Sequence, residues 1–268
     1  MKVGARDPKL EEGSRSHYEN AAYYDQTYRR RREDVDFYVD LAARHGGPIL
    51  ELGAGTGRAS RKLALAGHEV VGIDSAEPML EAAERHREKL PKHARERLSY
   101  ALGDLLELRL GRRFPLVISP FNVFMHVYDR RELALALETV RAHLAPGGYF
   151  VFDVLVPDPE ALARDPERVY RGRNVRLPPE RTLHRYGERF EYDPVTQIQT
   201  VTMIFEEIDP PHRVVTQTLT HRQWFPAELE ALLHYEGFEI VERFGDFERG
   251  PLDEYSESQI LVTRAVTP

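Results

Sequence analysis

The sequence predicts an α/β fold built around a parallel sheet, and the order of its apolar runs is the first reason. Residues 49–57 are an apolar run that ends in three glycines at alternate positions, and an Ala- and Leu-rich helical pattern follows. This order is typical of a buried strand that leads into a tight turn and the start of a helix. Apolar runs then alternate with helical patterns as far as residue 156. Such alternation predicts parallel strands joined by helices.

Composition sets the class of protein. The 268 residues, 41% hydrophobic and 30% charged, suit one large globular domain or one domain with an insertion. A net charge of −7 argues against a nucleic-acid partner, which needs a basic face. The lack of cysteine excludes disulfides and thiolate metal sites, and we expect no metal. No run of about 18 apolar residues or signal segment occurs, so we expect a cytoplasmic protein with no membrane partner.

The glycine turn predicts a small-molecule site. Glycine is needed where the backbone takes unusual dihedral angles or lies against a ligand, and free N–H groups at a helix start suit polar or anionic groups. The spacing excludes one cofactor. A dinucleotide fingerprint would continue from Gly53 and Gly55 to a glycine at position 58, where this chain has Arg58. A nicotinamide dehydrogenase is therefore disfavoured.

The segment Glu-Leu-Gly-Ala-Gly-Thr-Gly at residues 51–57 resembles motif I of the class I S-adenosylmethionine-dependent methyltransferases. Residues 144–148 are similar to the helix-to-strand turn of the same family. The resemblance implies a Rossmann-like, seven-stranded methyltransferase sheet whose last strand is antiparallel. It also implies S-adenosylmethionine as the cofactor and S-adenosylhomocysteine as the product.

Two acidic residues follow successive predicted strands. Asp74 lies about 20 positions beyond the glycine turn, where a carboxylate can hold a ribose diol, although it could instead cap the next helix. Gly103-Asp104-Leu105 resembles the family's acidic loop, in which Asp104 would bind the adenine amino group and Leu105 would offer its N–H. The predicted cofactor-binding residues are Glu51, Gly53, Ala54, Gly55, Gly57, Asp74, Ser75, Met79, Gly103, Asp104, Leu105, Pro120 and Tyr24.

The N-terminal region has two parts. Residues 1–16 are polar and predict a mobile arm without a site. Residues 17–28 are rich in tyrosine, four arginines follow at 29–32, and a helical pattern covers 34–45. One interpretation is an amphipathic helix that packs on the sheet with its arginines in solvent. The other is a lid, because a tyrosine-bearing N-terminal segment often covers the cofactor in the family.

The loop after the fourth predicted strand, residues 122–129, should face the methyl group, because ligands of such sheets bind beyond the strand carboxyl ends. His126 is the candidate general base, since its ordinary pKa lies near neutrality, or else it only shapes the pocket. Asp129 and Glu132 predict a helix cap. Residues 119–122 differ from the Asn/Asp-Pro-Pro-aromatic corner of the family's amino-methylating DNA enzymes, which disfavours that subclass.

Residues 182–192, 197–208 and 214–223 alternate polar with apolar or β-branched residues and predict an antiparallel insertion. Here the resemblance narrows to small-molecule methyltransferases, including amino-sugar and glycine N-methyltransferase relatives, in which such a sheet is a substrate cover or a dimer contact. Arg222 and Trp224 lie where the insertion returns to the core, so we expect them to form a substrate wall. The predicted substrate-binding residues are Tyr28, Asn122, His126, Tyr128, Arg222 and Trp224.

The sequence thus predicts three regions: an arm and lid helix at 1–45, a methyltransferase core at 46–160 and 225–268, and the insertion at 161–224. The predicted reaction is methyl transfer to a nitrogen or oxygen of a small metabolite, with a homodimer through the insertion as one possibility. A protein or RNA methyltransferase and a non-catalytic scaffold that binds S-adenosylmethionine are the alternatives. The sequence does not identify the acceptor.

Overall fold

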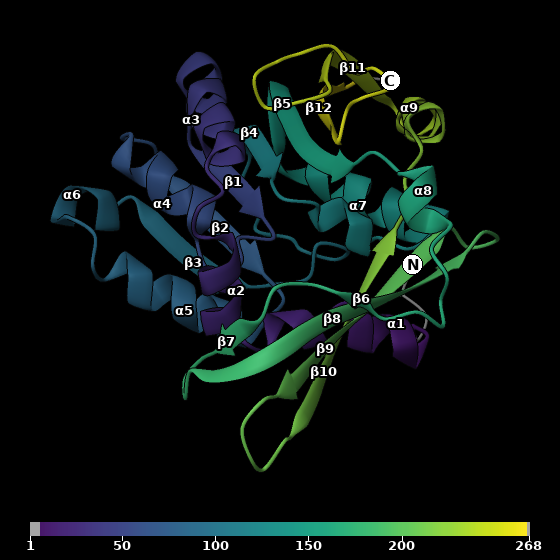
Figure 1. Cartoon of the computed structure of the whole chain (residues 1–268). Coiled ribbons are helices and arrows are strands. Elements are labelled where there is room, and N and C mark those ends of the chain that lie inside the picture. Colours follow the sequence, from purple (N-terminus) through teal and green to yellow (C-terminus); the bar gives the residue numbers. More distant parts are fainter. Residues whose placement is uncertain (1–5, 267–268) are drawn as a thin grey trace.

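The chain forms two β-sheets, a larger one covered by helices on both faces and a smaller antiparallel one (Figure 1). The structure is a computed structural model and describes residues 6–266. The larger sheet contains β1 (Ile49–Leu52), β2 (Val70–Asp74), β3 (Leu98–Leu102), β4 (Phe114–Ser119), β5 (Leu144–Leu155), β11 (Phe238–Phe244) and β12 (Ser258–Ala265). Its seven strands lie in the order β11-β12-β5-β4-β1-β2-β3.

The strand pairing confirms the predicted fold class. Strand β1 pairs in parallel with β2 and β4, and β4 pairs in parallel with β5. Strand β12 runs antiparallel to both of its neighbours, β5 and β11. All four residues of β1 are buried, as expected for a strand in a sheet with both faces covered. The parallel order places the carboxyl ends of β1, β2, β3 and β4 along one edge.

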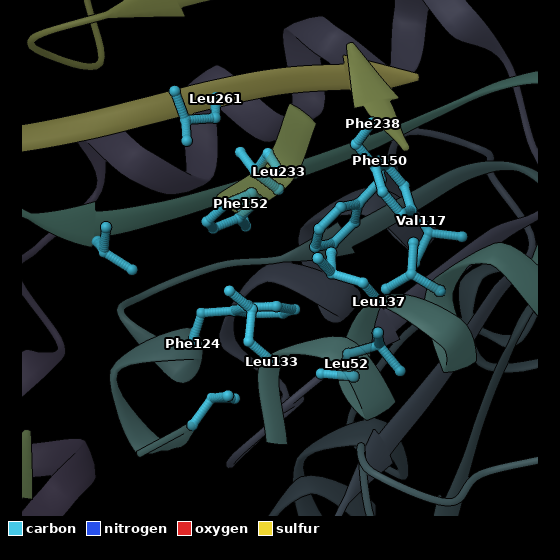
Figure 2. Close-up of a cluster of buried hydrophobic side chains, with 14 of the residues drawn as sticks. Leu52, Val117, Phe124, Leu133, Leu137, Phe150, Phe152, Leu233, Phe238 and Leu261 are labelled. Carbon is cyan, nitrogen blue, oxygen red and sulfur yellow. The ribbon is translucent and has the colours of Figure 1, made fainter. Parts of the chain in front are cut away.

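Two apolar clusters cover the faces of this sheet. On one face Phe150 and Phe152 pack with Leu133 of α7 and Leu233 of α9 (Figure 2). On the other face the residues of β1 and β4 pack against α3 and α4. The helices are α3 (Glu33–His45), α4 (Arg58–Leu65), α5 (Glu77–Arg87), α6 (Lys92–Arg95), α7 (Arg130–His143), α8 (Pro159–Leu162) and α9 (Pro226–Tyr235). Among residues 6–266, no helix is long and apolar enough to cross a membrane.

The smaller sheet is the predicted antiparallel insertion. It contains β6 (Tyr170–Arg171), β7 (Val175–Leu177), β8 (Thr182–Asp193), β9 (Ile198–Glu207) and β10 (Val214–Arg222). The order is β10-β9-β8-β6, and β7 also pairs with β8. The three long strands fall within one residue of the predicted ends. Strands β6 and β7 were not predicted, because two or three residues are too few to show an alternating pattern.

The prediction of a mobile arm over residues 1–16 is wrong for the part that the structure describes, and residues 1–5 lie outside it. The chain forms α1 (Pro8–Gly13), η1 (Ser16–Tyr18) and α2 (Ala21–Tyr28). Gly13 is buried against Thr220 of β10, and Arg6 pairs with Glu132 at 2.6 Å. The local signal was present, because the Asp7 side chain caps α1 and a proline follows it.

Helix α2 connects the two sheets. Its Tyr23 packs edge-on against Phe205 of β9, with ring centroids 5.3 Å apart. The next residue, Tyr24, packs in another direction against Met79 of α5. The tyrosine-rich segment therefore lies between the smaller sheet and the larger one, next to the edge where the parallel strands end (Figure 1).

Candidate functional site

A cavity lies beyond the carboxyl ends of the parallel strands, where ligands of open α/β sheets bind. Its walls come from the turn after β1, the residues after β2 and β3, the loop after β4, and the N-terminal segment. The predicted cofactor residues that line it are Gly53, Gly55, Asp74, Ser75, Met79, Gly103, Asp104, Leu105, Pro120 and Tyr24. The structure thus brings together residues that span nearly a hundred positions of the sequence. Glu51, Ala54 and Gly57 lie behind this lining.

The glycine turn serves the cavity at one position and the fold at another. Gly55 has φ +55°, and a Cβ there would meet nothing nearer than Met79 Cε at 3.6 Å, so its backbone lies open to the cavity. Gly57 has φ +77° and lies against Tyr100, whose hydroxyl would be 2.1 Å from an added Cβ. Glycine at 57 is therefore explained by packing and by the left-handed start of α4.

The Asp74 carboxylate joins the first two motifs. Its Oδ2 accepts the Gly55 N–H at 2.7 Å and its Oδ1 accepts the Ala76 N–H at 2.8 Å. Burial raises the pKa of Asp74, and these backbone hydrogen bonds oppose that rise. Helix α5 has Ala76 at its N-cap and no side-chain cap, so the alternative of Asp74 as a capping residue does not hold.

Glu51 is buried beneath the turn. Burial raises its pKa to about 8, opposed chiefly by a hydrogen bond with Ser60. Within the described chain, its Oε2 has no hydrogen-bond partner. A buried acceptor without a partner costs about 1–3 kcal/mol, so a donor or cation that reaches it would be bound favourably.

Asp153 of β5 holds the loop after β4 in shape. Its carboxylate accepts the Tyr38 hydroxyl at 2.7 Å and the N–H groups of Phe121 and Asn122 at 2.9 and 3.1 Å. Both loop residues have positive φ, +67° and +64°, which is uncommon for residues with a side chain. Burial raises the pKa of Asp153 to about 6. Asp153 lies inside an apolar run of the sequence, and sequence reasoning gives it no role.

His126 ends the short helix η2 (Val123–His126) and faces the cavity. Its Nε2 is 2.7 Å from the Tyr18 hydroxyl, and its Nδ1 is 3.3 Å from that of Tyr128. Burial, with smaller effects from nearby His221 and His17, lowers the pKa of His126 well below 6.5. The imidazole is therefore neutral near pH 7 and can accept a proton.

A group of buried histidines and tyrosines surrounds His126. The rings of His126 and His221 are 5.1 Å apart, and burial lowers the pKa of His221 and of His17 to about 4. Tyr128 lies behind His126, and its hydroxyl is 2.7 Å from the Thr220 hydroxyl. This end of the cavity is rich in hydroxyl and imidazole groups, and the Arg6 guanidinium lies 5.4 Å from the centre of the Tyr128 ring.

The predicted substrate wall is corrected, because Arg222 and Trp224 do not line the cavity. The Trp224 indole is buried in the core, where its N–H donates to the Phe124 carbonyl at 3.0 Å. Arg222 pairs with Glu228 at 2.7 Å and stacks on Trp224. Both residues do lie where the chain passes from the insertion back to the larger sheet, as predicted, but this segment does not line the cavity.

Three other predicted substrate residues also lie outside the cavity lining. Tyr28 packs behind Tyr24, and Asn122 lies in the turn held by Asp153. Tyr128 supports His126 from behind. Sequence reasoning noticed Tyr18 in the aromatic segment but did not select it. Lining residues that it missed altogether include Arg6, Ser14, Arg15, Phe121 and Val123.

Comparisons with known proteins agree with this arrangement. Residues 49–148 match the family described as "Methyltransferase domain". An "uncharacterized methyltransferase" of Bacillus cereus is 29% identical over 190 residues, which are 70% of this chain and 80% of that protein. The CcbJ methyltransferase of Streptomyces caelestis is 26% identical, with a TM-score of 0.76 over 95% of this chain and 99% of its own.

CalS10, an amino pentose methyltransferase from Micromonospora echinaspora with S-adenosylmethionine bound, is similar in fold. Its TM-score is 0.67 at 22% identity, over 91% of this chain and 97% of that one. The fold, the glycine turn and these similarities define the class. Residues 49–148 carry a methyltransferase domain, and the fold and the glycine turn are those of the class I S-adenosylmethionine-dependent methyltransferases. Methyltransferases of this fold have been solved with S-adenosylmethionine and with S-adenosylhomocysteine bound.

Proposed function

We propose that this protein transfers the methyl group of S-adenosylmethionine to a nitrogen or oxygen atom of a small metabolite. The observation that carries the proposal is the makeup of one cavity. Motif residues after β1, β2 and β3 line one side, and Tyr18 and His126 line the other. The cavity is also covered by the N-terminal segment, which suits a small acceptor rather than a macromolecule. The acceptor named for CalS10, an amino pentose, is of this kind.

The cavity residues fit the cofactor. Asp74 would hold the ribose hydroxyls, and Asp104 with Leu105 would hold the adenine. The unpartnered Oε2 of buried Glu51 suits the amino group at the other end, and the open Gly55 backbone allows close approach. Ser75, Met79, Pro120 and Tyr24 would complete the walls.

The Tyr18–His126 pair would serve the acceptor. S-adenosylmethionine supplies an activated methyl group, so the protein chiefly orients the acceptor and removes its proton. His126 is neutral near pH 7 and hydrogen-bonded to Tyr18, so it can take a proton directly or through that hydroxyl. A neutral amine needs little help from a base, whereas a hydroxyl needs its proton removed as it attacks.

The three predicted regions receive roles in this proposal. Residues 1–45 would close the cavity from above, because Arg6, Ser14, Tyr18 and Tyr24 all line it. Residues 46–160 and 225–268 would form the methyltransferase core. The insertion at 161–224 would support the cover, and its outer face is a candidate dimer contact that sedimentation analysis would test.

The test is an acceptor screen that measures S-adenosylhomocysteine release from amines and from alcohols of similar size. Turnover on a small amine or alcohol, lost in Tyr18→Phe or His126→Ala while cofactor affinity is kept, would support the proposal. Cofactor binding without turnover across both sets would favour the non-catalytic scaffold. Turnover only on a protein or RNA acceptor would overturn the small-molecule assignment.

A further inference from the structure

A second hollow, which we call the basic groove, lies beside the cofactor cavity. Its walls are the connection between α2 and α3, helix α4, the end of α5 and the turn before β8. Two acidic residues, Asp25 and Asp36, line it. Its basic residues are Arg29, Arg31, Arg32, Arg58, Arg61, Lys62 and Arg181. This excess of positive charge is unexpected in a chain whose net charge is −7.

Some of these groups have structural partners. Arg58 forms an ion pair with buried Asp34, and Arg61 Nε donates to the Gly57 carbonyl at 2.8 Å. The Asp25 carboxylate is already occupied, because it accepts the Thr56 hydroxyl at 2.6 Å and lies 3.3 Å from His86. Together, Asp25 and Asp36 offset only two of the seven positive charges of the groove.

Of the other five basic side chains, Arg31 lies over the Phe121 ring, 5.1 Å from its centre, and four remain without such partners. Over residues 6–266, the side chains of Arg29, Arg32, Lys62 and Arg181 make no hydrogen bond or ion pair. They come from three segments of the chain, so their convergence is not the result of one helix face. Like charges repel, and a groove that gathers seven basic side chains against two acids costs stability unless an anion binds there.

We propose that the basic groove binds the phosphate group of a phosphorylated small molecule. Phosphate accepts paired hydrogen bonds from the planar guanidinium group, and arginine predominates here. Apolar residues of the same groove, Val35, Leu65 and Pro178, offer a surface for the organic part of the ligand. The chain's overall negative charge opposes a long nucleic acid, which would extend beyond the groove.

The groove is a neighbour of the cofactor cavity and not part of it. Tyr24 lines both the groove and the cavity. Phe121 lines the cavity, and the guanidinium groups of Arg31 and Arg58 stack on its ring, 5.1 and 4.7 Å from the ring centre. The four unpartnered side chains line only the groove among these two hollows. The proposal therefore stands whether or not the methyl acceptor is the small metabolite suggested above.

The test uses pyrophosphate as the probe, titrated by calorimetry into the full chain at constant ionic strength. The variant Arg32→Gln/Lys62→Gln/Arg181→Gln removes three groove charges. Exposed Arg173, Arg185 and Arg213 lie outside the groove, and their triple Gln variant changes net charge equally. We expect wild type and control to bind equally and the groove variant to bind at least tenfold more weakly, the effect of about one charge-assisted contact.

A second titration, with S-adenosylhomocysteine at saturation, separates the two hollows. Unchanged pyrophosphate affinity would support a distinct site. Loss of binding under that condition would place pyrophosphate in the cofactor cavity and overturn the proposal. Failure of the wild type to bind, or equal weakening in the control variant, would also overturn it. Thermal unfolding of each variant verifies that the fold is kept.

Discussion

Asp74→Ala should abolish cofactor binding while the fold persists. The carboxylate lies in the cavity wall at the tip of β2, fixed by the N–H groups of Gly55 and Ala76. If it holds two ribose hydroxyls, each bond to a charged acceptor contributes about 1.5–3 kcal/mol. Their loss amounts to about 3–6 kcal/mol, which corresponds to about 10²- to 10⁴-fold weaker binding. Calorimetry with S-adenosylhomocysteine measures this without an acceptor.

Stability must be separated from affinity in this experiment. Asp74→Ala also leaves two N–H groups without their acceptor, so we expect a modest loss in the free energy of unfolding. Asp129→Ala is the matched control, because it removes an aspartate that accepts the Glu132 N–H at 2.8 Å and caps α7. Losing such a cap costs about 1 kcal/mol. Affinity within threefold of wild type for Asp74→Ala would refute the assignment, as would equal losses in both variants.

Three further outcomes follow from the site. His126→Ala should slow methyl transfer by about 10²-fold or more if the imidazole takes the proton, and full activity would refute that role. Because the pKa of His126 lies well below 6.5, the imidazole stays neutral between pH 8 and 6.5. The wild-type rate should therefore show no loss from this group over that range. Glu51 has a pKa of about 8, so cofactor affinity should rise from pH 6 to 8 as its ionised form pairs with the amino group. Glu51→Gln should remove that rise, and an equal rise in both proteins would contradict it. Trp224→Phe loses the bond to the Phe124 carbonyl and should lower the free energy of unfolding by about 1–3 kcal/mol without changing cofactor affinity, as denaturant titration would check.

The convergence of the strand-end residues on one cavity was predictable from sequence because its signals are local. A strand that ends in a glycine turn and a strand that ends in an aspartate can each be predicted from a few consecutive residues. Parallel pairing then places successive strand ends at one edge, so Gly55, Asp74 and Asp104 had to meet. The same logic explains the long strands of the insertion, whose alternation is visible over about ten residues each.

The Tyr18–His126 end of the cavity was not predictable because its contacts join distant segments. Tyr18 meets His126 across 108 positions, and Tyr128 meets Thr220 across 92. Nothing local tells whether a tyrosine in an aromatic run faces the cavity, as Tyr18 does, or packs behind it, as Tyr28 does. For the same reason, the sequence did not show whether the four arginines at 29–32 lie in solvent or line a groove.

The placement of the acceptor end also depends on Asp153, and this links the fold to the specificity of the site. Its carboxylate fixes the backbone of Phe121 and Asn122, directly before the short helix that ends at His126. The loop thus takes its shape from β5, while Tyr18 takes its position from η1 packed on β10. The distance between Tyr18 and His126 is therefore set by β5 and by β10, on which both η1 and η2 pack. A change in either support would alter the acceptor end while the cofactor residues at the strand tips keep their places.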